Sequence, residues 1–171
     1  MKIAIVAGAP SCMEAPFYNP DWQIWAVGPA VCESLPVIHR YFEVHPLWYP
    51  HLDTVAFKRF LAETQAEIWA HFPEVHSGSV QYPIEAISER FGTEFLSSSV
   101  SWMLALAIHK QASVIGLWGV DLISSIEYRQ QRPGVKHFIK IAELMGIEVR
   151  MPPDCPLLRD LPAYPPMEKH R

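Results

Sequence analysis

The chain contains a continuous apolar run, Lys2 to Ala7, that stops at the turn Gly8-Ala9-Pro10-Ser11. A strand with one face in water alternates apolar and polar residues, whereas a solid apolar run is typical of a strand buried on both faces of a parallel sheet. Three further runs also stop at polar or glycine-containing turns: Gln23 to Val27, Arg40 to Val44 and Ser113 to Trp118. The sequence therefore predicts an open parallel sheet that is covered on both faces.

Segments with helical features alternate with these strands. We expect helices over Asp53 to Ala66, Pro83 to Phe91, an apolar segment that begins near Ser98, and Val135 to Met145, and shorter strands over Glu67 to Phe72, Ser79 to Tyr82 and Ile147 to Met151. This alternation predicts a three-layer α/β fold with a mainly parallel central sheet. No linker or break in composition divides the chain, so we expect one domain over residues 1–158 and a proline-rich tail over residues 159–171.

Composition argues against several classes of partner. Fourteen basic against 18 acidic residues give a net charge of −4, which leaves no basic surplus for a nucleic acid. The three cysteines are an odd number without paired spacing, so we expect a reducing compartment, no disulfide framework and no zinc site. The longest uncharged run, Phe95 to Ile108, is too short for a membrane span. We expect a cytoplasmic protein.

Ligands of parallel α/β sheets bind beyond the carboxyl ends of the strands, so the residues that follow each predicted strand are candidate site residues. They are Gly8, Ala9, Pro10 and Ser11 after the first strand, Gly28 after the second, Glu43 and His45 at the third, and Gly119 and Asp121 after the strand that ends at Trp118. The serines Ser97, Ser98 and Ser99 precede the apolar helix, whose free N–H groups would point to the same edge.

The glycine turn and the serines each have two interpretations. Gly8 to Ser11 suits an anionic ligand, but the turn is neither a three-glycine dinucleotide motif nor a lysine-containing phosphate loop, and a plain strand-to-helix turn fits equally. One of the three serines is expected to be the helix N-cap, which leaves the other hydroxyls for a ligand or for solvent.

Acidic and basic side chains give further candidates. Glu43 and His45 point to the same face if the strand persists, and such a pair suits either acid–base catalysis or a structural contact. Asp121 directly follows an apolar strand, so its carboxylate needs solvent or a polar partner. It is either the N-cap of the next segment, a role for which Ser124 and Ser125 compete, or a ligand of a ribose or metal ion.

The segment Glu127 to Pro133 is expected to be a loop. In it, Tyr128 and Arg132 would hold a phosphate or carboxylate, or face solvent. Exposed aromatic residues in the Trp48-Tyr49 and Tyr82 regions would suit a contact between subunits of a homo-oligomer.

The order of four motifs resembles a known family. IVAGAPS, FLSSSVSWMLALAIHKQASVIGLWGVDL, EYRQQ and IEVRMPPDCPLL, in that order, are similar to the nucleotide-binding core of the Campylobacter-type bacterial sialyltransferases, which belong to glycosyltransferase family 42. The series is also similar to archaeal 6-hydroxymethylpterin diphosphokinase-like proteins and to short bacteriophage proteins.

The sialyltransferase resemblance implies a Rossmann-like fold that binds a cytidine nucleotide. It implies that Gly8, Pro10 and Ser11 lie near the phosphate and ribose, that Ser98 and Ser99 lie near the nucleotide, and that Tyr128 steadies the leaving phosphate. The chain has Ala9 and Gly28 where the family has asparagine, and a short connection after Asp121 replaces the family's inserted lid, which carries its catalytic histidine.

These observations predict a small transferase-like protein that binds a nucleotide or nucleotide sugar. We expect His45 to be the base, Glu43 to orient it or bind a metal ion, and Asp121 and Arg132 to hold the polar substrate. The diphosphokinase-like alternative would use Asp121, with Glu43, to hold Mg²⁺ against the phosphates of ATP. A third alternative is a nucleotide-binding protein without catalysis.

Overall fold

The computed structural model describes residues 1–28 and 34–159. Strands in this part form one sheet, with the bounds β1 (Lys2–Val6), β2 (Trp22–Ala26), β3 (Arg40–Glu43), β4 (Glu67–Ala70), β5 (Val80–Gln81), β6 (Val114–Trp118) and β7 (Glu148–Arg150). Every pair of neighbouring strands is parallel, and the order is β5-β4-β3-β2-β1-β6-β7. The structure therefore confirms the parallel sheet and each predicted strand.

The strand order reverses beside β1. The chain builds the sheet outward from β1 through β2, β3, β4 and β5, and then crosses back so that β6 pairs with the other side of β1. Two connections that leave adjacent strands in opposite directions open a crevice at their carboxyl ends, which is where ligands bind in such sheets. The reversal makes the β1 and β6 ends the switch point of this fold.

Four α-helices lie in the described part of the chain: α2 (Val55–Glu63), α3 (Ile84–Phe91), α4 (Ser99–His109) and α5 (Ile126–Leu144). Short 3₁₀ turns are η1 (Pro10–Glu14), η2 (Pro50–Asp53), η3 (Pro73–Val75) and η4 (Pro156–Leu158). The hydroxyls of Thr54, Ser98 and Ser125 cap α2, α4 and α5 by accepting a backbone N–H. The N-cap after β6 is thus Ser125 and not Asp121.

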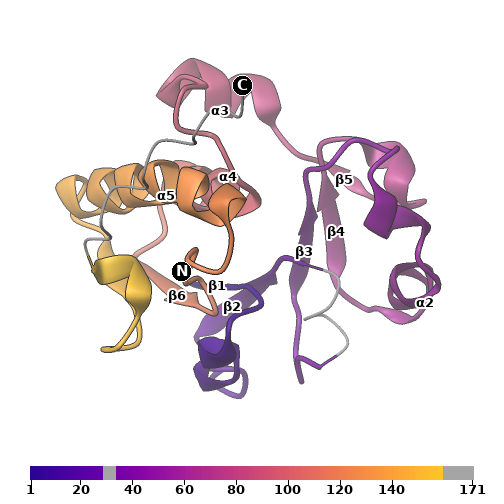
Figure 1. Cartoon of the computed structure of the whole chain (residues 1–171), viewed down its shortest axis with the longest axis horizontal. Helices are drawn as coiled ribbons and strands as arrows, with labels where there is room; N and C mark the ends of the chain where they lie inside the picture. Colours follow the sequence, from indigo (N-terminus) through magenta and orange to yellow (C-terminus); the bar gives the residue numbers. More distant parts are fainter. Residues whose placement is uncertain (29–33, 160–171) are drawn as a thin grey trace, which may run out of the picture.

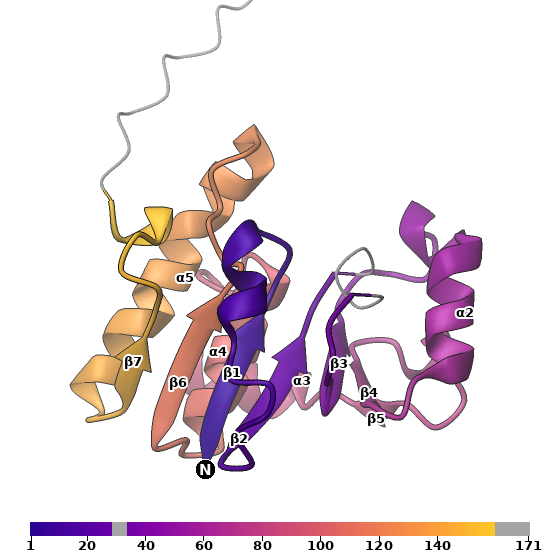
Figure 2. The same ribbon diagram turned by 90° about the horizontal axis from the view of Figure 1, so that it is seen from below.

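Helices cover both faces of the sheet, which confirms the three-layer, Rossmann-like α/β fold. Successive β1 side chains alternate between two cores: Ile3 and Ile5 pack in the core with α3, α4 and α5, and Ala4 and Val6 pack in the core with α2. Figure 1 shows α4 and α5 on one side of the sheet and α2 on the other. Figure 2 shows η1 in front of β1, with α4 and α5 behind the strands.

The prediction of a loop from Glu127 to Pro133 is wrong, because this segment forms the first turns of α5. The helix begins nine residues before the predicted start at Val135, where Ser125 Oγ accepts from the N–H of Tyr128 at 3.1 Å. Pro133 lies inside the helix, although a proline usually ends one. Tertiary packing outweighs that penalty, since Gly134 lies so close to Phe95 that a Cβ would overlap its carbonyl oxygen.

Arg132 anchors this helix to two distant segments. Its side chain is 6% exposed, and its guanidinium donates to the carbonyl oxygens of Asp121 (2.9 Å), Pro156 (3.1 Å), Leu157 (3.2 Å) and Arg159 (2.8 Å). These bonds join the connection after β6 to the chain that follows β7. The structure therefore gives Arg132 a role within the fold.

The two turns at the switch point are tied together. The N–H of Ala9 donates to the carbonyl of Gly119 (3.0 Å), and the N–H of Gly119 donates to Ser11 Oγ (2.9 Å). Gly119 has φ +68°, and a Cβ there would overlap the carbonyl oxygen of Ala7. Only glycine allows this close approach, so the switch point depends on it.

Three further expectations concern the exposed aromatic residues, a membrane span and the C-terminal tail. Tyr82, expected in an exposed region, is fully buried, and its hydroxyl donates to the carbonyl of Trp102 (2.7 Å). Trp48 is exposed, at 78%. In the part of the chain that the structure describes, no helix has both the length and the apolar character needed to cross a bilayer. Nearly all of the predicted tail, residues 160–171, lies outside the described residues.

Substitution of Gly119 by alanine is expected to destabilise the fold severely. The left-handed conformation and the overlap with Ala7 together predict a loss of at least about 3 kcal/mol in the free energy of unfolding. Gly78→Ala is the matched control: Gly78 has φ +92° with open space around it, so we expect a loss of about 1 kcal/mol. Urea unfolding measures both, and equal losses would contradict the close approach at Gly119.

Removal of the Arg132 guanidinium is expected to loosen the segments that it joins. Arg132→Met removes the donor of four carbonyl groups, most of them partly buried, which predicts a loss of about 3 kcal/mol. Arg129→Met, in the first turns of the same helix, removes an exposed hydrogen bond to the carbonyl of Ile123 (3.3 Å) and is expected to cost less than about 1 kcal/mol. Thermal unfolding compares them, and an unchanged midpoint for Arg132→Met would contradict the anchoring role.

Candidate functional site

The structure brings several polar side chains together at the carboxyl end of β3, around Glu43. The Glu43 side chain is 2% exposed. Its Oε1 atom accepts from the backbone N–H of His45 (2.9 Å) and lies 2.6 Å from His45 Nδ1. Its Oε2 atom lies 2.8 Å from His51 Nε2 and 3.3 Å from the Tyr41 hydroxyl. The predicted pairing of Glu43 with His45 is confirmed, and both carboxylate oxygens are occupied.

Local sequence explains why these groups meet. Strand β3 ends at Glu43, and His45 lies in the turn that follows. Pro46, with its fixed φ, stiffens this turn. Pro50 then starts η2, which carries His51, and both the N–H and the hydroxyl of Thr54 donate to the carbonyl of His51. The 3₁₀ turn thus continues directly into the capped start of α2, which fixes where His51 lies.

Aromatic rings surround the two imidazoles. Tyr49 lies on His45, with ring centroids 4.2 Å apart and an interplanar angle of 32°. The rings of His45 and His51 meet edge to face at 4.9 Å, and the Phe57 ring contacts His51 at 5.4 Å. These contacts restrict rotation of both imidazoles, so the polar atoms around Glu43 are held in place.

The electrostatics of the cluster follow from burial and hydrogen bonding. Burial alone would raise the pKa of Glu43, but hydrogen bonds from His45 and His51 outweigh it and hold the pKa below its ordinary value. Glu43 is therefore an anion at neutral pH. The backbone N–H of His71 donates to the carbonyl of Glu43, and burial lowers the pKa of the His71 imidazole to about 4, so this ring stays neutral.

This arrangement can support two kinds of chemistry. A carboxylate that holds Nδ1 of an imidazole fixes its tautomer and leaves Nε2 to accept a proton, as a general base requires. One oxygen or nitrogen from each of Glu43, His45 and His51 also lies within 4.8 Å of the others, a grouping that can hold a metal ion.

Sequence reasoning missed His51. The expectation of no zinc site considered the cysteines and overlooked ligands from histidine and carboxylate. A signal was present in Pro50-His51, a turn-forming pair that follows the strand ending at Glu43 and His45 within a few residues.

The predicted serines lie at the carboxyl edge of the sheet, because α4 runs back antiparallel to β6, which follows it. Ser98 is the N-cap: its hydroxyl accepts from the N–H of Ser101 (3.1 Å), and Ser101 Oγ accepts from the N–H of Ser98 (2.9 Å) in return. This confirms that one serine caps the helix. Ser99 begins α4, and Ser97 Oγ is in contact range of Gly134 in α5.

The glycine turn and Tyr128 share this edge. Gly8 and Pro10 are exposed, Ala9 is half-buried, and Pro10 begins η1. Tyr128 lies in the first turn of α5, at 45% exposure. Gly28, after β2, has φ +95°, and the residue after it lies outside the described part of the chain.

Asp121 stands apart from the Glu43 cluster. It follows β6, while Glu43 ends β3, and β2 and β1 lie between them. Three strand spacings correspond to roughly 14 Å, so these carboxylates do not share one ion. The structure therefore places the predicted catalytic group His45 and Glu43 together and leaves Asp121 with the switch point.

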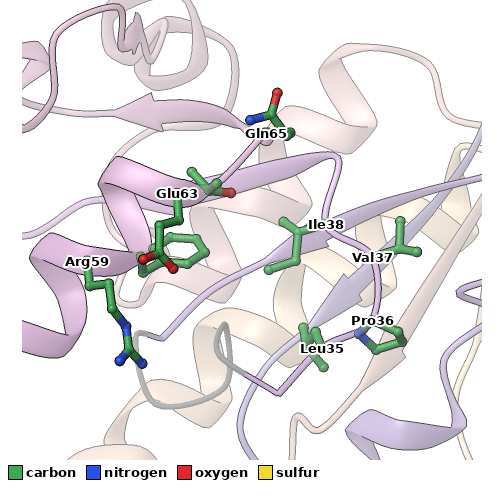
Figure 3. Close-up of a pocket in the computed structure, with 9 residues that line it drawn as sticks. Leu35, Pro36, Val37, Ile38, Arg59, Glu63 and Gln65 are labelled. Carbon is green, nitrogen blue, oxygen red and sulfur yellow. The ribbon is translucent and has the colours of Figure 1, made fainter.

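A pocket of about 440 Å³ lies elsewhere, between α2 and the segment that leads into β3. Figure 3 shows Leu35, Val37 and Ile38 on one side of it and Arg59 and Glu63 on the other. Its lining contains none of the site residues predicted from the sequence.

Comparisons with known proteins bear on the fold. No protein-family model and no curated protein sequence matches the chain. Solved structures of the sialyltransferase CstII from Campylobacter jejuni do match. The structure with cytidine-5'-monophosphate gives a TM-score of 0.57 at 13% identity and covers 91% of this chain and 80% of that chain.

Further structures of that enzyme agree. The structure with the substrate analogue CMP-3FNeuAc gives a TM-score of 0.52 at 14% identity, covering 91% of this chain and 81% of that chain. A point variant with CMP gives 0.56 at 12% identity, covering 86% and 80%. At these identities the likeness establishes that the chain shares the fold of a sialyltransferase that was solved with CMP.

Proposed function

We propose that this protein binds a cytidine nucleotide, as CMP or a CMP-activated sugar, at the carboxyl edge of its sheet, and that it acts as a small transferase. The observation that carries the proposal is the shared fold: structures that match over 91% of this chain were solved with CMP and with CMP-3FNeuAc. A ligand of this fold belongs at the switch point, where the chain carries its glycine turn.

The switch point has the chemistry for a phosphate. Exposed Gly8 leaves the backbone of the turn accessible, and the turn is held rigid by its bonds to Gly119. The N-termini of α4 and α5 face the same edge, and the positive ends of their dipoles favour an anion. In this proposal Ser99 and Tyr128 lie beside the nucleotide.

The Glu43 and His45 pair would act on the group that is transferred. Strand β3 is two positions from β1, which corresponds to roughly 10 Å. In this proposal the sugar extends from a phosphate at the glycine turn toward the pair. With Nδ1 held by the carboxylate, His45 Nε2 is the proposed base, in place of the histidine that the resemblance puts in a lid.

The alternative functions predicted from the sequence are distinguished by the nucleotide-binding experiment described below. The separation of Asp121 from Glu43 removes the shared Mg²⁺ site of the diphosphokinase-like alternative, so that reaction would need Asp121 alone. The similarities to diphosphokinase-like and bacteriophage proteins, a homo-oligomer with Trp48 at its contact, and a cytoplasmic location stay predictions.

Isothermal titration is expected to show CMP binding that depends on the glycine turn. Gly8→Asp places a negative charge at the proposed phosphate site and is expected to weaken CMP at least about 10-fold. Gly146→Asp adds the same charge before β7, at the opposite edge of the sheet, and is expected to change the affinity less than about 2-fold.

A preference for ATP with Mg²⁺ over CMP would instead support the diphosphokinase-like alternative. Equal weakening by both aspartates, or no response to any nucleotide, would contradict the binding site proposed here.

Release of CMP from a CMP-sugar is expected to require His45. In metal-free buffer, His45→Gln is expected to lower turnover about 100-fold or more, because general base catalysis contributes roughly 10² to 10⁴. CMP affinity should stay within about 2-fold, since the imidazole acts beyond the nucleotide. His137→Gln in α5 is the control with full turnover expected. Unchanged turnover in His45→Gln would refute the base, and binding without turnover in the wild type would favour a non-catalytic nucleotide-binding protein.

A further inference from the structure

Glu43, His45 and His51 form a compact set of ligand atoms at the end of β3. We propose that these three side chains bind one divalent transition-metal ion of the zinc type. The proposal depends on the geometry of the cluster and is independent of nucleotide binding at the switch point.

The donor set fits such an ion. Imidazole nitrogens suit zinc and other late first-row metals, while carboxylates alone would favour Mg²⁺ or Ca²⁺. Two histidines with one carboxylate are the protein ligands of several zinc sites, which leave a fourth position for water or a substrate atom. The cluster supplies that combination from positions 43 to 51.

The ligand atoms lie near the spacing of a bound ion. Zinc bonds of about 2.0 to 2.2 Å place the ligand atoms of a tetrahedral ion roughly 3.4 Å apart. Here His45 Nδ1 lies 2.6 Å from one Glu43 oxygen and His51 Nε2 lies 2.8 Å from the other, which are hydrogen-bond distances, and the set of ligand atoms spans at most 4.8 Å. An ion would therefore replace these two hydrogen bonds and move each nitrogen away from its carboxylate oxygen by less than about 1 Å.

Burial gives a reason for a cation at this place. The Glu43 carboxylate is 2% exposed, and among residues 1–28 and 34–159 its ion-pair partners are the two histidines. A buried anion is costly unless a positive charge compensates it. A divalent ion bound to neutral imidazoles would supply that charge directly.

The surroundings hold the ligands ready. The Tyr41 hydroxyl and the His45 N–H both donate to the Glu43 carboxylate and so fix its orientation. Tyr49 lies on the His45 ring, and Phe57 lies against His51. Ligands that need little reorganisation lose little conformational entropy when the ion binds.

A bound ion and a catalytic base at His45 exclude each other. The ion takes Nδ1 of His45 in place of its contact with Glu43, and a coordinated imidazole loses its basicity. The metal-free and metal-bound forms of the cluster therefore differ in chemistry, and the ion is expected to inhibit any reaction that uses His45 as a base.

Titration of the full-length, chelator-treated protein with Co²⁺ tests the proposal. Visible absorption bands of Co²⁺ report tetrahedral or five-coordinate binding, and metal analysis counts ions per chain. We expect one Co²⁺ per chain, displaced by Zn²⁺. His51→Gln, whose amide can still donate to Glu43 but is a poor ligand, is expected to bind at least about 100-fold more weakly. Tyr41→Phe is expected to weaken binding about 10-fold.

His137→Ala is the matched control, because His137 lies in α5, stacked on Phe95 and away from β3. It should bind Co²⁺ as the wild type does. Circular dichroism confirms that each variant is folded, and if His51→Gln is not, His51→Asn replaces it. Absence of the Co²⁺ bands, or wild-type affinity in a folded His51 variant, would overturn the proposal. CMP binding is measured on the same samples, so failure of the metal site and failure of the nucleotide site are told apart.

Discussion

Parallel hydrogen bonding on both sides of β1 determines where everything else in this protein can lie. The five residues of β1 pair in register with β2 and with β6. Parallel pairing sends the carboxyl ends of all strands to one edge, and each helix that leads into the next strand must return from that edge. Helix N-termini, the glycine turn and the Glu43 cluster share an edge for this reason.

The edge holds two centres of different chemistry. At the switch point, backbone groups and helix ends present partial positive charge, which suits a ligand phosphate. At the end of β3, a buried carboxylate is the fixed negative charge, and histidines and a tyrosine hydroxyl satisfy it. In the functions proposed above, the first centre holds the nucleotide, and the second, two strands away, moves a proton or holds a cation.

The sequence carries much of this architecture and less of the site. Solid apolar runs such as Lys2 to Ala7 predict buried parallel strands because burial on both faces leaves no polar position. The first nine residues of α5 escaped prediction, because tight packing at Gly134 and the Arg132 anchor overcome Pro133 and neither contact is visible in one dimension. Glu43 and His45 could be paired because residues two apart share a face of an extended chain, and the pair forms although β3 ends at Glu43. His51 could not, since its position depends on a 3₁₀ turn and on ring contacts.

The sheet also governs how the chain reaches its native state. Ser113 Oγ donates to the carbonyl of Met1 across 112 positions of sequence, at the place where β6 joins β1. Until β6 emerges from the ribosome, β1 has no partner on that side, and the backbone N–H and C=O groups of this edge stay unpaired. Non-local pairing of this kind slows folding, and until it is complete the unpaired strand edges and exposed apolar surface favour aggregation with other chains. We therefore expect slow folding from the same topology that builds the site.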